Sequence, residues 1–224
     1  MKAPAKKDGP VVVVDCGLGN LNSIKNALVR VGVQPKISRL PEEILNAGAI
    51  IFPGVGAFAS AMEKISILGL AETIKTAAVE KKIPFLGICL GMQVLFDGSE
   101  EFGWHPGLGI LSGSVKAFDP TQFDPELQLR VPHVGWNDVS PPQASSLFCT
   151  MSEEACFYFD HSFAVFKAGP ELSAATCDYG QRFIAAVEFE NIMGVQFHPE
   201  ISGKLGHLLL ANFLSFVRKA EYPN

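Results

Sequence analysis

The chain has 224 residues, of which 48% are apolar and 18% are charged, and its formal net charge is -5. This is the composition of a globular protein large enough to bury a core without disulfides. It excludes the basic surface typical of nucleic-acid binding, and no apolar run approaches the roughly 20 residues that a membrane span needs.

The chain begins with a basic stretch, residues 1–10, that lacks the apolar core of a signal peptide and ends at Pro10. We expect a flexible tail there, which a cleaved organelle-targeting sequence could once have preceded. No repeat or low-complexity linker divides the rest, so we predict a single domain over residues 11–224.

Short apolar runs alternate with helical patterns in the next part of the chain. The runs predict strands, and the patterns between them predict helices, the last one bent near Gly69. The strands are expected at 11–15, 35–39, 49–52 and 84–88, and the helices at 21–31, 41–48 and 57–82. Repeated βα units of this length predict an α/β fold, with an open, mostly parallel central sheet and helices on both faces.

After Gly107 the runs become shorter and are separated by Gly, Pro and Asp turns. This texture predicts additional antiparallel strands before a final amphipathic helix at 206–219. The strands are expected at 109–118, 147–151, 156–166, 172–180, 183–189 and 192–197.

One of the predicted parallel strands ends in the stretch "PFLGICLGMQ" (84–93), where Cys89 lies between Gly87 and Gly91. The form G-x-C-x-G is that of a nucleophile elbow, and its glycines relieve crowding in a strained turn from strand to helix. The turn places Cys89 beside free N–H groups that stabilise a thiolate, and the N–H of Leu90 can bind an oxyanion. The alternative is a buried structural cysteine, which is the commoner role of this residue.

A cysteine nucleophile needs a base, and "QFHPE" (196–200) offers His198 at the end of a predicted strand with Glu200 two residues later. In extended backbone this spacing turns both side chains toward the same side, so the carboxylate can orient the imidazole. We therefore predict the catalytic residues Cys89, His198 and Glu200. The competing histidines, which lack such an acid, are His105, His133, His161 and His207.

The five cysteines are odd in number, scattered and without CxxC spacing, which argues against a disulfide framework and against a metal site. They favour a cytoplasmic protein. There is no Walker loop, and "GLGN" (17–20) alone is too weak to predict a dinucleotide site. We expect no cofactor and no metal.

Together "PFLGICLGMQ" and "QFHPE" resemble the class I, triad-type glutamine amidotransferases over nearly the whole chain after the tail. Within that family, "PGVGAF" (53–58) and "RVPHVGWN" (130–137) resemble the glutaminase subunits of imidazole glycerol phosphate synthase. The sequence departs from that pattern at Cys16, where tyrosine is common, at Phe163, where tyrosine is more usual, and at Ile201, where lysine is common.

The resemblance implies the class I glutamine amidotransferase fold and a set of residues around the glutamine substrate. Gln93 and the acidic Glu101, which would receive the α-ammonium group, are among them. The full substrate set is Gly54, Gln93, Glu101, His161, Ser162 and Phe163. The resemblance also implies hydrolysis of L-glutamine through a γ-glutamyl thioester on Cys89, and delivery of the ammonia to a cyclase subunit, a (β/α)8 barrel, in histidine synthesis.

The "PGVG" loop (53–56) is expected to supply the second oxyanion donor, the backbone N–H of Val55 or Gly56. Glycines on both sides of Val55 allow its peptide planes to rotate, which makes the loop a candidate for a switch controlled by the partner. Tight packing of a Gly-rich turn is the equally open alternative. We expect Trp136, in a loop bounded by Pro and Gly, and His133 of the same stretch at the partner interface.

Two readings from other classes remain: a cysteine hydrolase or stress protein on the same sheet, and a catalytically silent binding module. The first gives no reason for Gln93, Glu101 and "HSF" (161–163) to occur together, and the second is disfavoured because all three predicted catalytic residues are present. Within the amidotransferases, the nearest rival is a subunit that serves another synthase.

Overall fold

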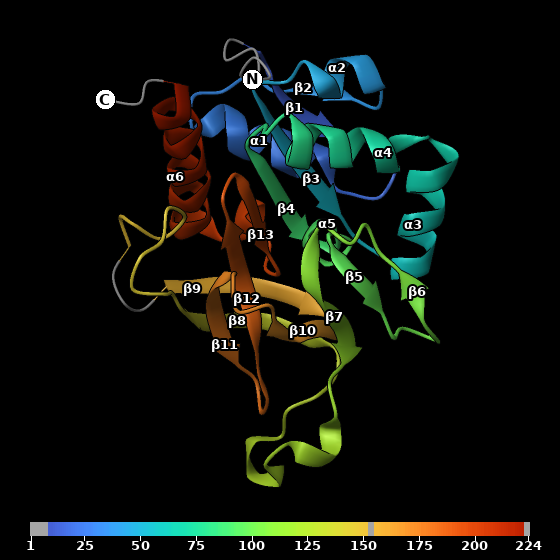
Figure 1. Cartoon of the computed structure of the whole chain (residues 1–224). Helices are drawn as coiled ribbons and strands as arrows, with labels where there is room; N and C mark the ends of the chain where they lie inside the picture. The colour runs from blue at the N-terminus through green and yellow to red at the C-terminus, as the bar shows by residue number, and fades with distance from the viewer. Residues whose placement is uncertain (1–8, 152–154, 222–224) are drawn as a thin grey trace.

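The computed structural model of the chain describes residues 9–151 and 155–221 (Figure 1). Residues 1–8 of the expected tail lie outside the described residues. At the end of this expected tail, the Pro10 carbonyl accepts a hydrogen bond from the Gly48 N–H at 3.0 Å.

Five parallel strands form the upper half of the sheet, in the order β2, β1, β3, β4 and β13. They are β2 (Lys36–Ser38), β1 (Val11–Val14), β3 (Ala49–Gly54), β4 (Phe85–Cys89) and β13 (Ile192–Val195). β1 consists of four valines and β4 reads FLGIC without a charged residue, because a strand covered on both faces is apolar throughout. The predicted strands of the first half of the chain are confirmed.

Helices cover both faces of this parallel part (Figure 1). On one face, α1 (Leu21–Arg30) and α6 (Gly203–Glu221) bury apolar residues against the sheet, and on the other face α2 (Pro41–Leu45), α3 (Phe58–Ile67) and α4 (Leu70–Lys75) do so. Adjacent residues of β3 point to opposite faces: Ile51 packs in the core on the side of α1 and α6, and Ile50 packs in the core on the side of α2, α3 and α4. The predicted layered α/β architecture is therefore confirmed.

The predicted bend in the helical region 57–82 is confirmed at Gly69, whose φ of 65° lies in the left-handed region. Such a conformation interrupts α-helical hydrogen bonding and favours glycine. The region continues as α4 and ends in one π-helical turn, Thr76–Glu80.

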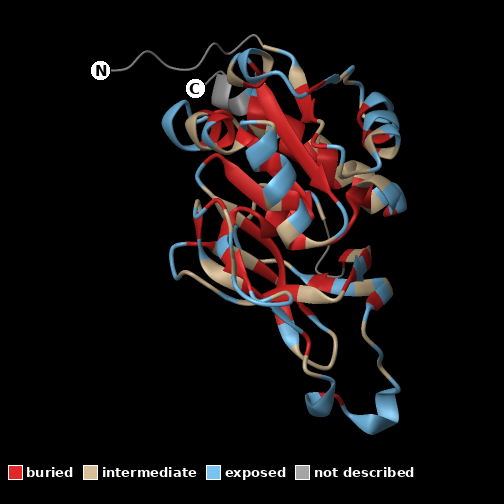
Figure 2. Cartoon of the chain, turned by 90° about the vertical axis from the view of Figure 1, so that its right-hand side faces the viewer, coloured by how far each residue is buried: buried red, intermediate tan, exposed pale blue. Residues whose placement is uncertain are grey.

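The remaining strands extend the sheet with mostly antiparallel pairs, shown in the lower half of Figure 1. They are β5 (Phe96–Ser99), β6 (His105–Pro106), β7 (Leu111–Ala117), β8 (His133–Ser140), β9 (Ala155–His161), β10 (Phe163–Ala168), β11 (Ser173–Asp178) and β12 (Arg182–Phe189). The extension between β7 and β8 projects from the body and is largely exposed (Figure 2).

Three expectations need correction in this half. β5, β6 and β8 were not predicted, and the expected run 156–166 is divided at Ser162 into β9 and β10. The strand expected at 147–151 is wrong. Leu147 and Phe148 are buried, but the N–H groups of Ser146 and Leu147 donate to the Glu188 carboxylate, so this backbone forms turns and not a ladder.

No helix within residues 9–151 and 155–221 is long and apolar enough to cross a membrane.

Candidate active site

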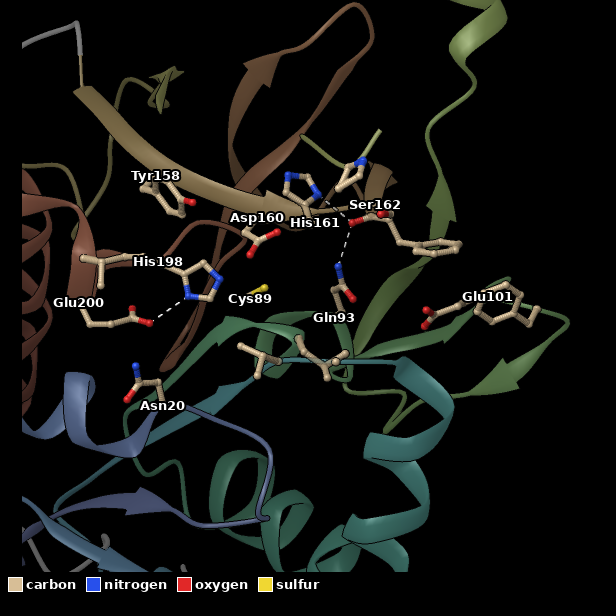
Figure 3. A pocket seen from close by; sticks show the side chains of 17 residues that line it. Asn20, Cys89, Gln93, Glu101, Tyr158, Asp160, His161, Ser162, His198 and Glu200 are labelled. Carbon is tan, nitrogen blue, oxygen red and sulfur yellow. Dashed lines mark hydrogen bonds and ion pairs between the residues drawn. The ribbon is translucent and has the colours of Figure 1, made fainter. Parts of the chain in front are cut away.

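A pocket of about 550 Å³ opens where the parallel strands end, between the upper and lower halves of the sheet (Figure 3). Ligand sites of open parallel sheets are found at this edge. Among the expected site residues, the pocket is lined by Val55, Gly56, Cys89, Leu90, Gln93, Glu101, His161, Ser162, Phe163, His198 and Glu200.

Cys89 is the last residue of β4 and has φ 53° and ψ -113°, outside the regions favoured by residues with a Cβ. This strained turn lifts the thiol above the sheet, as the elbow predicts. The elbow glycines are required by close approach, because a Cβ at Gly91 would overlap the Phe52 carbonyl and one at Gly87 would lie 2.6 Å from the Gly91 carbonyl oxygen. The helix that follows, α5, spans Leu90–Gln93.

His198 follows β13, and its backbone is fixed on both sides. Its N–H donates to the Tyr158 carbonyl at 2.9 Å, and its carbonyl accepts from the Ser202 hydroxyl at 2.7 Å. Its Nδ1 lies 2.9 Å from Oε1 of Glu200, with both side chains buried. The short spacing therefore brings acid and imidazole together.

Burial by itself lowers the pKa of His198, but hydrogen bonds and charge interactions with Cys89 and Glu200 outweigh burial and raise that pKa to about 10. An imidazole with a raised pKa carries its second proton at neutral pH. The site thus favours an imidazolium held between a sulfur and a carboxylate, which is the arrangement that stabilises a thiolate.

The other histidines are poor candidates for a base. Burial lowers the pKa of His133 to about 4 and that of His161 to about 3, so both are neutral at physiological pH. His105 and His207 do not line the pocket. Within the described part of the chain, His198 is the histidine that lies beside both Cys89 and an orienting acid.

Gln93 and Glu101 approach the pocket from different elements. The Gln93 amide donates to the carbonyl of Phe163 at 2.9 Å and to Oε1 of Gln196 at 2.9 Å. One carboxylate oxygen of Glu101 accepts from the Phe58 N–H at 2.6 Å, where α3 begins. These bonds fix two of the expected substrate residues before any ligand is bound.

Gln196 was not predicted, although it lies in "QFHPE" two residues before His198. Its amide nitrogen lies 3.6 Å from Sγ of Cys89, and its side chain is fully buried. The period of two along a strand places positions 196 and 198 on the same side, and this was the signal available in the sequence. The pocket is also lined by residues outside the expected site, which are Asn20, Phe102, Pro132, Tyr158, Asp160 and Ile201.

The "PGVG" loop, which is expected to supply the second oxyanion donor, lies beside Cys89, but its Val55 N–H is already used in a hydrogen bond. Gly54 pairs with Cys89 across β3 and β4, so the "PGVG" loop leaves the sheet beside the nucleophile. The Val55 N–H, however, donates to the Leu18 carbonyl, and Gly56 has a φ of 106° that glycine tolerates best. Gly54 itself does not line the pocket.

The expected interface residues lie on strand β8 and not in a loop. Trp136 is 56% exposed and packs edge-on against Tyr158 with ring centroids 6.0 Å apart. His133 is only 1% exposed, so its side chain is not on the surface, and this expectation is corrected. The cause is the alternation of a strand: 134 and 136 face outward, whereas 133 faces the core.

No cluster of three or more metal-ligating side chains occurs within the described ranges, and the pocket chemistry described above uses a thiol, an imidazole and carboxylates.

The class-I glutamine amidotransferase family model matches residues 12–216. The chain is 44% identical over 220 residues to the imidazole glycerol phosphate synthase subunit HisH of Thermosynechococcus vestitus, covering 97% of this chain and 100% of that relative. It is 42% identical over 211 residues to the subunit of the same name from Nostoc punctiforme, covering 93% and 97%. A crystal structure of a glutamine amidotransferase has the same fold, with a TM-score of 0.72 at 20% identity over 92% of this chain and 98% of that one.

Proposed function

The chain belongs to the class I glutamine amidotransferase family, and we propose that it is the glutaminase subunit of an imidazole glycerol phosphate synthase. Relatives carrying that name match almost the whole chain at more than 40% identity, and this observation carries the proposal. The pocket with Cys89, His198 and Glu200 at one edge of the sheet supports the same activity.

In the proposed reaction, the Cys89 thiolate attacks the side-chain amide carbon of L-glutamine. The amide oxygen becomes an oxyanion, which collapses as the carbon–nitrogen bond breaks. The His198 imidazolium gives its proton to the departing nitrogen, so ammonia leaves and a γ-glutamyl thioester remains on Cys89. The raised pKa of His198 supports this role, because the proton needed by the leaving group is already on the ring.

A water molecule completes the cycle. The neutral His198 takes a proton from this water as the oxygen attacks the thioester carbon, and the carbon–sulfur bond breaks to restore the thiolate. Glutamate is released and the imidazolium is restored. Glu200, 2.9 Å from Nδ1, holds the ring orientation and stabilises its charge at both steps.

The substrate contacts are proposed for Gly54, Gln93, Glu101, His161, Ser162 and Phe163, the set that the family resemblance implies. Support comes from the pocket, which Gln93, Glu101 and Ser162 line together. Glu101 offers its second carboxylate oxygen for the α-ammonium group, because one oxygen is occupied by the Phe58 N–H. Phe163 stands where the family usually has tyrosine. Its backbone carbonyl, and not its ring, accepts the hydrogen bond from the Gln93 amide, so this contact does not depend on the side chain.

The oxyanion donors are proposed to be the N–H of Leu90 and an N–H at Val55 or Gly56. Because the Val55 N–H is bonded to Leu18, its peptide must rotate before it donates toward Cys89. An oxyanion hole missing one donor loses about 100- to 1,000-fold in rate. We therefore propose that the chain alone is a poor glutaminase and that its synthase partner favours the rotated loop.

The proposed partner is the cyclase subunit, a (β/α)8 barrel that uses the ammonia in histidine synthesis. The exposed ring of Trp136, which packs against the pocket residue Tyr158, supports docking on this face. We propose a cytoplasmic location, and the five free cysteines are consistent with a reducing compartment.

The test compares glutamine turnover by the chain alone, with the cyclase, and with the cyclase plus its phosphoribulosyl substrate. We expect the rate to rise at each step. Turnover by the chain alone at the fully assembled rate would overturn the loop switch, whereas no turnover in any mixture would overturn the glutaminase assignment. Capture of a different synthase in a pull-down would instead favour an amidotransferase subunit of another pathway.

A further inference from the structure

A continuous series of hydrogen bonds joins strand β8 to the nucleophile. On its first half, His161 Nδ1 lies 2.9 Å from the Phe163 carbonyl oxygen, and His161 Nε2 lies 3.1 Å from His133 Nδ1. His133 Nε2 in turn lies 3.3 Å from the amide nitrogen of Asn137. The atoms of this half come from β8, β9 and β10.

The chemistry of these groups assigns a single direction to the bonds. A carbonyl only accepts, so His161 must carry its proton on Nδ1 and present a lone pair at Nε2. His133 must then donate from Nδ1 and accept at Nε2 from the NH2 group of Asn137. The lowered pKa values of both histidines agree with neutral rings that each carry one proton.

The second half runs from Phe163 to the sulfur. The Phe163 carbonyl accepts a second bond from the Gln93 amide, whose other hydrogen goes to Gln196 Oε1. Gln196 then places its own amide nitrogen 3.6 Å from Sγ of Cys89. Both hydrogens of the Gln93 NH2 group are used, so Gln93 joins the two halves.

Packing restricts how the series can move. The His133 ring is stacked between Phe159 and Tyr179, with centroids 4.7 and 3.9 Å away. Because His133 belongs to β8, a shift of that strand moves the ring between these two neighbours, and a displaced ring would leave the buried His161 Nε2 without its donor. Trp136 lies on the same strand and faces outward, on the surface where the partner is proposed to dock.

We propose that Asn137, His133 and His161 are positioning residues that couple the outer face of β8 to Gln93 and Cys89. The relay, as we name this set of three residues, acts on the glutaminase site and so rests on the proposed function. A partner bound at Trp136 shifts β8 relative to β9, and the relay transmits that shift to the Phe163 carbonyl, to Gln93, and through Gln196 to the sulfur. A purely structural polar cluster would contribute stability but not coupling.

The test uses the full chain with its cyclase partner and measures the ratio of stimulated to basal kcat for glutamine. His133→Phe keeps a stacked ring but removes both hydrogen bonds, and Asn137→Asp replaces a donor with an acceptor at a half-exposed position. We expect each to lower the ratio at least about fivefold, the lower end of typical coupling between sites, with an unchanged Kd for the cyclase. Ser140→Ala, an exposed position on the same strand, is the matched control and should keep the wild-type ratio.

Retention of the wild-type ratio by both relay variants would overturn the relay, even where Tm falls. A wild-type chain that the cyclase does not stimulate would overturn the proposed function and the relay with it. A second measurement needs no variant: nitrogen NMR of the wild-type chain at neutral pH should show His133 and His161 as neutral Nδ1–H tautomers. An Nε2–H tautomer at either ring would contradict the assigned direction and overturn the relay.

Discussion

Gly54 and Cys89 are register partners in the parallel pair of β3 and β4. Both strands end at this pair, so the "PGVG" loop and the nucleophile leave the sheet side by side. The Val55 N–H, one residue beyond, donates to the Leu18 carbonyl. Rotation of a single peptide would therefore change the donors that face the sulfur, and the remaining chemistry would stay in place.

The first prediction concerns the nucleophile. Cys89→Ser should lower glutamine-dependent synthesis by about 1,000-fold or more, because a serine hydroxyl at this site lacks equivalent activation. Ammonia supplied directly should still support synthesis by the assembled complex. Both rates are measured on the same preparation, and loss of both together would indicate that Cys89 is structural.

His198→Asn should cost more than Glu200→Gln, by about tenfold or more in kcat, because the histidine moves protons at both steps whereas the glutamate orients it. Both variants should keep the wild-type fold, and their circular dichroism spectra check this. A His198→Asn chain with wild-type kinetics would remove His198 from the mechanism.

The raised pKa of His198 gives a third prediction. Its hydrogen bond to Cys89 and its interactions with Glu200 raise the pKa to about 10 from 6.5, so the imidazolium stabilises the fold fully below pH 6.5 and this stabilisation is lost as pH rises through about 10. In Cys89→Ser the thiolate is absent, so the pKa of His198 should fall. Nitrogen NMR titration of the ring in both chains measures this, and equal values would show that sulfur does not charge the imidazole.

The sequence was sufficient for the features that depend on local pattern. The β-branched run at 11–14, the glycines around Cys89 and the i, i+2 spacing of His198 and Glu200 each have a short-range physical cause, and the structure has the corresponding strand, turn and contact. Local patterns of the same kind also predict the parallel strands of the sheet.

Features set by distant partners were not predictable in the same way. The Pro and Gly in "RVPHVGWN" predict a loop, yet the ladder with β9 makes this stretch the strand β8 and turns His133 inward. Leu147 and Phe148 are apolar enough for a strand, but the carboxylate of Glu188, about 40 residues later in the chain, accepts hydrogen bonds from the N–H groups of Ser146 and Leu147. The relay likewise joins residues whose proximity only the tertiary fold creates.

The elbow gives a stability prediction. Gly91→Ala should lower the free energy of unfolding by about 3 kcal/mol, because the new methyl group on α5 overlaps the backbone carbonyl of Phe52 in β3 and both residues are buried. Urea unfolding measures the loss. Gly19→Ala is the matched control, since its added Cβ would lie an ordinary 3.6 Å from Pro53. A Gly91→Ala chain as stable as this control would show that the elbow is not tightly packed.

The last prediction concerns assembly. Trp136→Ala should weaken binding to the cyclase by about 2 kcal/mol or more, which is about 30-fold in Kd, because large aromatic rings dominate interface energies. Alkylation of Cys89 by a diazoketone glutamine analogue in the isolated chain should persist, since Trp136 does not line the pocket. Leu40→Ala is the matched control: Leu40 is 55% exposed, close to the 56% of Trp136, and lies just before α2 at the opposite end of the molecule (Figure 1). Isothermal titration gives Kd for all three chains. An unchanged Kd for Trp136→Ala would move the interface away from β8, whereas a weakened Leu40→Ala would place part of it at the other end of the sheet.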